Sequence, residues 1–173
     1  IRRGVFNGCY EGPFFDSLPL EWKTSFTFAF VRNPYDRLVS AWRMFSTGML
    51  NTQWGHNFNH EFKDISFIDF LKVATDSTID HESRDNMRSI LRHHTLPMLD
   101  PFHCIQYADF IGRFEQLEQD FSVISTKLSL GKVDFDHMNR TVRGDYQKYY
   151  DDYSYHIVSK HYKNDIDEFD YKF

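Results

Sequence analysis

The chain has 173 residues, a length at which a single domain is the ordinary outcome. Hydrophobic residues make up 41% and charged residues 26%, which is typical of a globular protein and excludes a disordered chain. No stretch of the sequence approaches the roughly 20 consecutive apolar residues of a membrane span. The 20 basic and 25 acidic residues give a net charge of −5, whereas proteins that coat nucleic acid usually carry the opposite excess. We therefore expect no nucleic-acid partner, and any anion site must be local.

The first clear element is a strand that runs directly into a helix. Residues 26–31 read FTFAFV, which predicts a strand covered on both faces, as in a parallel sheet. Asn33 then suits the N-cap of a helix, Pro34 its first position, and Asp36 its first turn. Gly48 predicts the end of this helix. Its buried stripe is expected to hold Leu38, Trp42, Phe45 and Met49.

Two helices and two short strands are expected further along. Ser66, followed three residues later by Asp69, predicts a capped helix, and residues 83–92 predict another. Residues 103–106 and 109–114 each predict a short strand.

The last part of the chain is expected to be helical. A helix is predicted from Leu117, ending at Gly131. From Asp145 onward the sequence predicts a tyrosine-rich helical region that lies against the sheet. The expected tyrosines and their apolar neighbour are Tyr146, Tyr149, Tyr150, Tyr153, Ile157 and Tyr162. Because strands and helices alternate, the fold class is α/β, and we expect one domain over residues 1–173.

The turn after residues 26–31 has the composition of a phosphate site. Arg32 ends the strand, so its guanidinium and the positive end of the helix are expected to face one point. Ser40 lies three residues after Arg37, and its hydroxyl can donate a hydrogen bond to the same anion. The alternative is that Arg32 pairs with Asp36 and the segment is only a well-capped helix.

The amino-acid sequence of this segment resembles that of a known family. FVRNPYDRLVSAW, residues 30–42, is similar to the 3′-phosphate-binding motif of sulfotransferases that use 3′-phosphoadenosine 5′-phosphosulfate (PAPS), particularly the carbohydrate sulfotransferases and their bacterial relatives. Four further strings resemble the family in the same order: HTLP at 94–97, DFIGRFEQLEQDF at 109–121, HMNRT at 137–141 and YKNDIDEFDYKF at 162–173. The resemblance therefore extends over nearly the whole chain.

This resemblance implies a fold, a donor and a donor site. The fold is a three-layer α/β domain, a parallel sheet flanked by helices, related to the P-loop kinases. The donor is PAPS, the product is 3′-phosphoadenosine 5′-phosphate (PAP), and no metal ion is implied. Arg32 and Ser40 match the ligands of the 3′-phosphate, while Arg37 matches a residue that we expect to position the loop. Arg140 and Arg143 are expected to close over the nucleotide or the acceptor, or else to be solvated surface arginines.

Transfer to a hydroxyl also requires a base that accepts its proton. His94 is our candidate, because imidazole accepts a proton near neutral pH and the HTLP segment matches the family. Alternatively, His94 or His93 binds substrate or caps the preceding helix. Glu11 and Asp16 are the other candidates for the base.

One part of the family pattern is absent from the sequence. The family's phosphosulfate-binding loop follows the pattern KTGGTS, and residues 4–12 (GVFNGCYEG) lack its lysine and hydroxyl residues. We expect the domain to be missing its N-terminal strand and loop, because natural sheets generally avoid an unpaired edge. The alternative is a shortened relative that serves as a non-catalytic nucleotide- or glycan-binding module. A P-loop kinase relative is less favoured, because a Walker-type loop is absent too.

Charge and cysteine content bear on the acceptor and the compartment. The net charge of −5 argues against a highly anionic glycosaminoglycan and favours a neutral or short carbohydrate, or another small alcohol. Two cysteines and the lack of a targeting segment favour the cytoplasm of a bacterium. A eukaryotic relative whose anchor had been removed would instead lie in the Golgi lumen.

Overall fold

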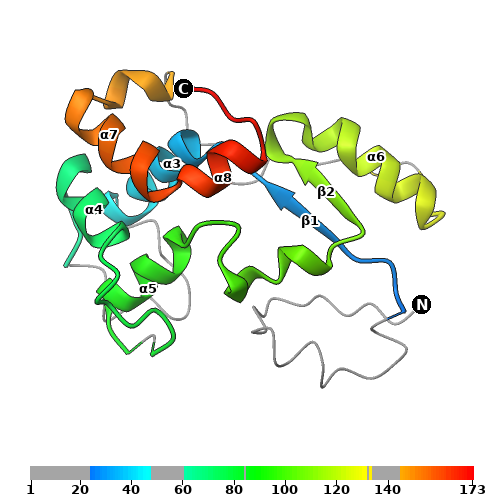
Figure 1. The fold of residues 1–173 in the computed structure, drawn as a ribbon, viewed down its shortest axis with the longest axis horizontal. Helices are drawn as coiled ribbons and strands as arrows, with labels where there is room; N and C mark the ends of the chain where they lie inside the picture. The colour runs from blue at the N-terminus through cyan, green and yellow to red at the C-terminus, as the bar shows by residue number, and fades with distance from the viewer. Residues whose placement is uncertain (1–23, 48–60, 84, 132, 134–144) are drawn as a thin grey trace. The chain divides into compact units, whose positions relative to one another are not determined.

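The computed structural model describes residues 24–47, 61–83, 85–131, 133 and 145–173 (Figure 1). The chain divides into two compact units, which are described separately. The first comprises Ile1–Arg32 and Met98–His137, and the second comprises Asn33–Pro97 and Met138–Phe173. Among the described residues, no helix combines the length and the apolar character that crossing a membrane requires.

The first unit contains a small parallel sheet. Strand β1 (Phe28–Val31) pairs with β2 (Phe110–Arg113), with Val31 opposite Arg113. Both strands were predicted, and each is shorter than its predicted range. Val31 is 1% exposed but Phe28 is 42% exposed, so the strand is not covered along its whole length as expected. Within the described residues the sheet has two strands, and a larger three-layer sheet remains a prediction.

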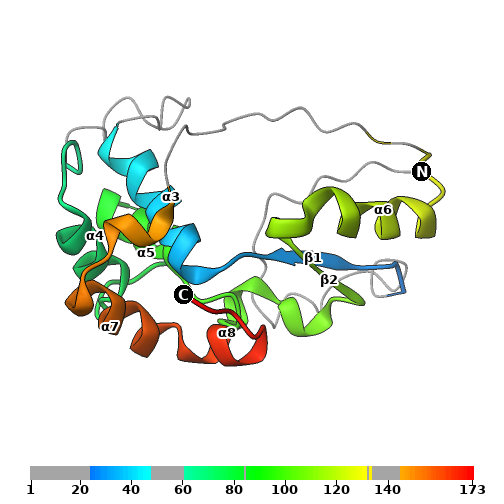
Figure 2. The same ribbon diagram turned by 90° about the horizontal axis from the view of Figure 1, so that it is seen from above.

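Helix α6 (Leu117–Lys127) follows β2 after a 3₁₀ turn, η3 (Phe114–Gln116). It runs beside the sheet of the first unit, as Figures 1 and 2 both show. Phe121 meets Phe28 edge to face, with ring centroids 6.4 Å apart, which joins the helix to β1. The helix ends before Gly131, the predicted terminator, which has φ of 73° and lies in the turn beyond.

The strand predicted at residues 103–106 is wrong. Two 3₁₀ helices occupy this region, η1 (Pro101–His103) and η2 (Ile105–Tyr107). Asp100 starts the first, because its carboxylate accepts the backbone N–H of Phe102 at 3.0 Å. Cys104 joins them at φ 53°, a left-handed conformation that no strand can include.

The second unit is helical among its described residues. Its elements are α3 (Pro34–Ser46), α4 (Phe67–Ala74), α5 (Met87–Thr95), η4 (Tyr146–Tyr149), α7 (Asp152–His161) and α8 (Lys163–Glu168). The predicted caps Asn33 and Ser66 are confirmed, since each side chain accepts a backbone N–H of the helix it precedes. The helix predicted over 83–92 begins only at Met87, because the Asn86 side chain caps it by accepting the N–H of Ser89 at 2.9 Å.

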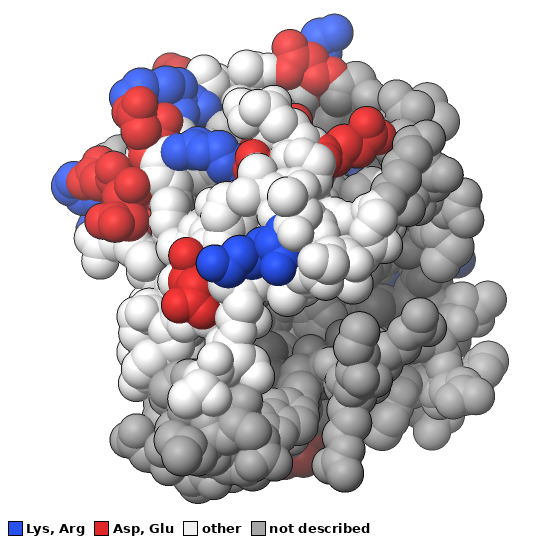
Figure 3. Space-filling view, turned by 90° about the vertical axis from the view of Figure 1, so that its right-hand side faces the viewer, with Lys and Arg blue, Asp and Glu red and all other residues white. Residues whose placement is uncertain are grey.

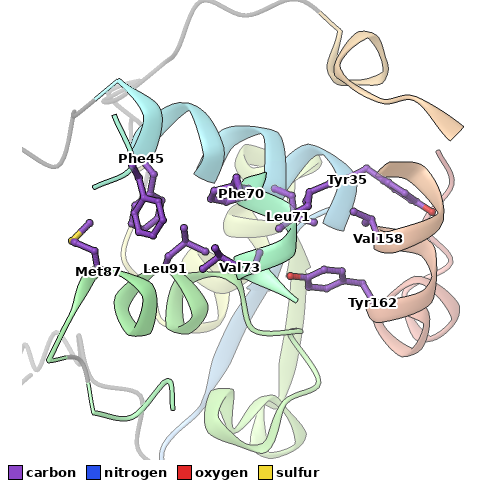
Figure 4. Packing of buried hydrophobic residues seen from close by; sticks show 12 residues of the cluster. Tyr35, Phe45, Phe70, Leu71, Val73, Met87, Leu91, Val158 and Tyr162 are labelled. Carbon is purple, nitrogen blue, oxygen red and sulfur yellow. The ribbon is translucent and has the colours of Figure 1, made fainter. Parts of the chain in front are cut away.

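The core of the second unit lies between α3, α4, α5 and α7 (Figure 4). Leu38, Phe70 and Leu91 are fully buried there, one from each of the first three helices. Aromatic pairs fill much of the remaining space, including Phe45 and Phe70 at 6.1 Å between ring centroids. Large flat side chains thus let short helices complete a core.

The stripe predicted on α3 is largely confirmed. Leu38 and Phe45 are buried, and Trp42 is half-buried with its Nε1 donating to the Ile65 carbonyl at 2.8 Å. Met49, the fourth predicted member, and Gly48, the predicted terminator, lie outside the described residues; α3 itself ends at Ser46.

The tyrosine-rich region makes its described contacts within the second unit, and its predicted packing against the sheet stays a prediction. Tyr150 and Tyr162 pack against helices of their own unit. The ring centroids of Tyr150 and of Tyr35 on α3 are 5.6 Å apart. Tyr153 is 60% exposed, so the expectation that it is covered is wrong. On α7 it lies away from the buried Val158, on the solvent side of the helix.

Candidate functional site

The start of α3 has the local structure that the sequence predicts. Asn33 caps the helix, its Oδ1 accepting the N–H of Tyr35 at 3.0 Å, while Pro34 takes the first helical position and Asp36 the first turn. The N–H of Arg37 donates to the Asn33 carbonyl at 2.9 Å. The N–H groups of Tyr35 and Arg37 are therefore used inside the helix, and the helix dipole and nearby side chains contribute to its attraction for an anion.

The Ser40 hydroxyl has no hydrogen-bond partner among the described residues. It lies in the second turn of α3, between the buried Val39 and the half-buried Ala41, and is itself half-buried. Within the part of the chain that the structure describes, its hydroxyl makes no hydrogen bond. By contrast, the Ser46 hydroxyl at the end of the same helix donates to the Arg43 carbonyl at 3.4 Å. The Ser40 hydroxyl is thus available to a ligand.

Arg32 is the last residue of the first unit and directly follows β1. Its guanidinium carbon lies 4.4 Å from the centroid of the Phe114 ring, a cation–π contact that restricts the side chain. The residue is half-buried.

Arg37 contacts the end of α5 within the second unit. Its Nη2 donates to the carbonyls of Leu96, at 2.6 Å, and Thr95, at 3.4 Å. Its guanidinium also lies 5.7 Å from the ring of Tyr162. These contacts tie α3 to the end of α5, where the HTLP segment begins.

His94 stands in the last turn of α5 with an exposed ring. Its Nδ1 lies 2.9 Å from the Ile90 carbonyl, and the ring meets Phe45 edge to face at 5.8 Å. Because a carbonyl oxygen only accepts, Nδ1 carries the proton and Nε2 of the neutral ring is the acceptor. This bond to its own helix matches the alternative of a capping histidine, while the free Nε2 is compatible with a base.

The remaining predicted site residues cannot be placed. Arg140, Arg143, Glu11 and Asp16 all lie outside the described residues. Among the described residues, no group of three or more histidine, cysteine, aspartate or glutamate side chains could hold a metal ion.

An open cavity of about 340 Å³ lies in the second unit at α4 and the start of α5. Its walls hold Glu61, Phe62, Ile65, Asp69, Lys72, Val73 and Arg88. Two of these pair with each other, as Lys72 Nζ lies 2.8 Å from Asp69. Neither Ser40 nor His94 is among its walls. The described charges on the face shown in Figure 3 are likewise mixed, with Lys and Arg beside Asp and Glu.

One set of contacts at the start of α3 is not predictable from the sequence. Asn33 Nδ2 donates to the Lys172 carbonyl at 2.8 Å, and the Tyr150 hydroxyl donates to the Tyr35 carbonyl at 2.9 Å. Both contacts join residues 145–173 to the start of α3. The clustered tyrosines were noted, but their partners were not predicted.

The chain thus combines a parallel strand pair with helices, as α/β proteins do, and carries a capped helix whose Ser40 hydroxyl has no hydrogen bond within the described residues. The model of the sulfotransferase family matches residues 17–172. The chain therefore belongs to the sulfotransferase family, whose members in general transfer a sulfonyl group. No curated protein and no solved structure matches it significantly.

Proposed function

We propose that the protein transfers a sulfonyl group from PAPS to a hydroxyl of a neutral or short carbohydrate, or of another small alcohol. Family membership supports the class of reaction. The observation that carries the donor site is the half-buried Ser40 hydroxyl, which has no hydrogen bond within the described residues and lies in the second turn of a capped helix. A polar group in such a position gains most from a ligand that accepts its hydrogen bond.

The donor's 3′-phosphate is the proposed ligand of Ser40 and Arg32. Arginine suits phosphate because its planar fork of N–H groups matches two oxygens at once. The positive end of α3 adds to the attraction. Arg140 and Arg143 are proposed to close over the nucleotide or the acceptor.

The donor supplies an activated sulfonyl group whose sulfur is attacked by the acceptor oxygen. The new S–O bond forms as the bond from sulfur to the phosphate oxygen breaks, and PAP leaves with that electron pair. The acceptor proton must go to a base, and His94 Nε2 is our candidate because Nδ1 is committed to the Ile90 carbonyl. The hydrogen bond at Nδ1 also supports the charged ring that results.

The charge of the protein guides the choice of acceptor. The net charge is −5, and on the face in Figure 3 basic and acidic side chains are mixed. Long sulfated chains favour broad basic grooves. A neutral or short acceptor fits this balance better.

Titration with PAP tests the donor site. Ser40→Ala should weaken PAP binding about tenfold, the expected loss of one hydrogen bond to a charged group. Ser46→Ala is the matched control, because within the described residues its hydroxyl bonds to the Arg43 carbonyl of the same helix. Arg32→Ala should weaken binding more than Arg32→Lys, which keeps the charge. Undiminished affinity in Ser40→Ala and Arg32→Ala would reject the site.

Transfer itself is tested with PAPS carrying ³⁵S and a panel of neutral sugars, sulfated sugars and simple alcohols. His94→Gln should lower kcat by about a hundredfold or more while PAP affinity stays unchanged. Labelled neutral sugar or alcohol is the expected product. PAP binding with no transfer to any acceptor would instead support a nucleotide-binding module.

A further inference from the structure

Asn33 does more than cap a helix. Its side chain is only 8% exposed, and the two ends of its amide serve different partners. Oδ1 accepts the N–H of Tyr35 at 3.0 Å, while Nδ2 donates to the Lys172 carbonyl at 2.8 Å. Nδ2 also lies 3.3 Å from the Tyr146 hydroxyl. One side chain thus joins the first turn of α3 to residues 113 and 139 positions away in sequence.

The end of the chain is packed where this bond is made. The Phe173 ring lies against four tyrosines, with centroid distances of 5.0 Å to Tyr35, 4.9 Å to Tyr155, 5.4 Å to Tyr150 and 6.0 Å to Tyr146. Such edge-to-face pairs are each favourable. They hold the tail against the same turn of α3 that Asn33 caps.

The tail is also tied to the helix through Tyr35 itself. The Tyr150 hydroxyl donates to the Tyr35 carbonyl at 2.9 Å, and the Tyr35 hydroxyl lies 2.8 Å from Ser159 Oγ on α7. The side chain and the carbonyl of Tyr35 are therefore both fixed from the C-terminal part of the chain.

The choice of asparagine is informative. Serine or aspartate caps a helix equally well, since either side-chain oxygen can accept the Tyr35 N–H. Neither can also donate from an amide nitrogen to the Lys172 carbonyl, and an aspartate would place a carboxylate against that oxygen. Only an amide serves both partners.

We propose that Asn33 is a positioning residue, and that residues 171–173 form a C-terminal latch that fixes the first turn of α3 for donor binding. This inference rests on the proposed function, because the turn matters to catalysis only if Ser40, less than two turns further along α3, binds the donor. The latch lets the end of the chain set the direction of the helix that carries Ser40. A displacement of Ser40 by about 1 Å would matter, because catalysis depends on precise placement of the bound groups.

The decisive variant is Asn33→Ser, which keeps an oxygen for the cap and removes the amide donor. Asn86→Ser is the matched control: it makes the same change at the cap of α5, where Asn86 has no hydrogen bond from its amide nitrogen within the described residues. Phe173→Ala removes the aromatic part of the latch without touching the cap.

PAP affinity, the KM values for PAPS and acceptor, and hydrogen exchange are measured on each variant. Asn33→Ser should raise the Kd for PAP about three- to tenfold, and the KM for PAPS with it, while the KM for the acceptor stays unchanged. Hydrogen exchange of the Arg37 amide, which donates to the Asn33 carbonyl, should become faster by a similar factor. Phe173→Ala should change both in the same direction, and the double variant should lose less than the sum of the two.

Asn86→Ser should leave both quantities near those of the native protein. Exchange and PAP affinity that are the same in Asn33→Ser and Asn86→Ser would overturn the latch. A rise of both substrate KM values together would indicate general loss of structure and would overturn the positioning role. Should the native protein bind no PAP, the proposed function falls and donor positioning with it, whereas the exchange of the Arg37 amide still decides whether the tail fixes α3.

Discussion

Tyr162 makes the stability of the second unit sensitive to alkaline pH. Its side chain is fully buried in the core shown in Figure 4, and its hydroxyl donates to the Thr95 carbonyl at 2.6 Å. Burial raises the pKa of Tyr162 from 10.0 to about 12, because a phenolate in the core would lose its water. Nearby Arg37 and Arg92 act in the opposite direction but do not cancel this effect.

The sign and size of the effect follow from linkage. The folded pKa of Tyr162 is the higher one, so the unfolded chain loses this proton first as the pH rises. The associated stability is complete below pH 10.0, the unfolded pKa, and is lost as the pH rises towards the folded pKa of about 12. At about pH 11 the loss from this one residue is about 1.4 kcal/mol.

Urea unfolding at about pH 8 and pH 11 measures this loss. Burial also raises the pKa values of Tyr150 and Tyr35, so the native protein should lose more than Tyr162 alone accounts for. Tyr162→Phe should be about 1 kcal/mol less stable at pH 8, having lost one buried hydrogen bond. Its further loss between the two pH values should be about 1.4 kcal/mol smaller than that of the native protein.

Tyr153→Phe is the control for this experiment, because the Tyr153 side chain is 60% exposed and lies outside the buried core. It should show the same pH dependence as the native protein. An equal loss in Tyr162→Phe and in the native protein would refute the reasoning.

Two further changes are tested by urea unfolding: one alters packing in the first unit, and the other alters a helix cap in the second. Gly112→Ala should destabilise the first unit by about 1–3 kcal/mol, because its new Cβ would lie 2.5 Å from the Phe30 ring, and adding Phe30→Leu should recover part of that loss; full stability in Gly112→Ala would contradict the close approach. Hydrogen bonds from Ser154 hold the pKa of Asp151 below its usual 3.8, so the stability from the ionised carboxylate is present above pH 3.8 and is lost as the pH falls through the lower folded pKa. Asp151→Asn keeps an oxygen for the cap and should therefore lose less stability between about pH 5 and pH 3 than the native protein, whereas an equal loss would count against this role.

The fold was predictable where local chemistry decides it. The beginning of α3 follows from Asn33 and Pro34, whose preferences act within one turn and need no distant partner. Residues 103–106 are predicted as a short strand, but the structure has 3₁₀ helices there. The cap from Asp100 and the left-handed Cys104 decide otherwise, and neither effect shows in hydrophobic periodicity.

The candidate site was only partly predictable, because several of its contacts join residues far apart in the sequence. The sequence predicts Arg32 and Ser40 as site residues through their spacing and resemblance, and that assignment stays a prediction. The contact from Asn33 to the Lys172 carbonyl joins positions 139 residues apart. A backbone carbonyl exists at every residue, so the sequence cannot show which of them receives such a bond. The phenyl ring of Phe173 among four tyrosines likewise depends on the path of the chain.

The nine residues from Arg32 to Ser40 can now be divided by their contacts. Asn33, Tyr35 and Arg37 each bond to other segments of the second unit, namely the C-terminal tail, α7 and the end of α5. The Ser40 side chain has no such bond within the described part of the chain. A phosphate site, as proposed for this segment, needs ligands that are held in place, and the bonds of these three polar residues fix the segment. Changes at those three should therefore lower stability and donor affinity together, whereas a change at Ser40 should lower donor affinity alone.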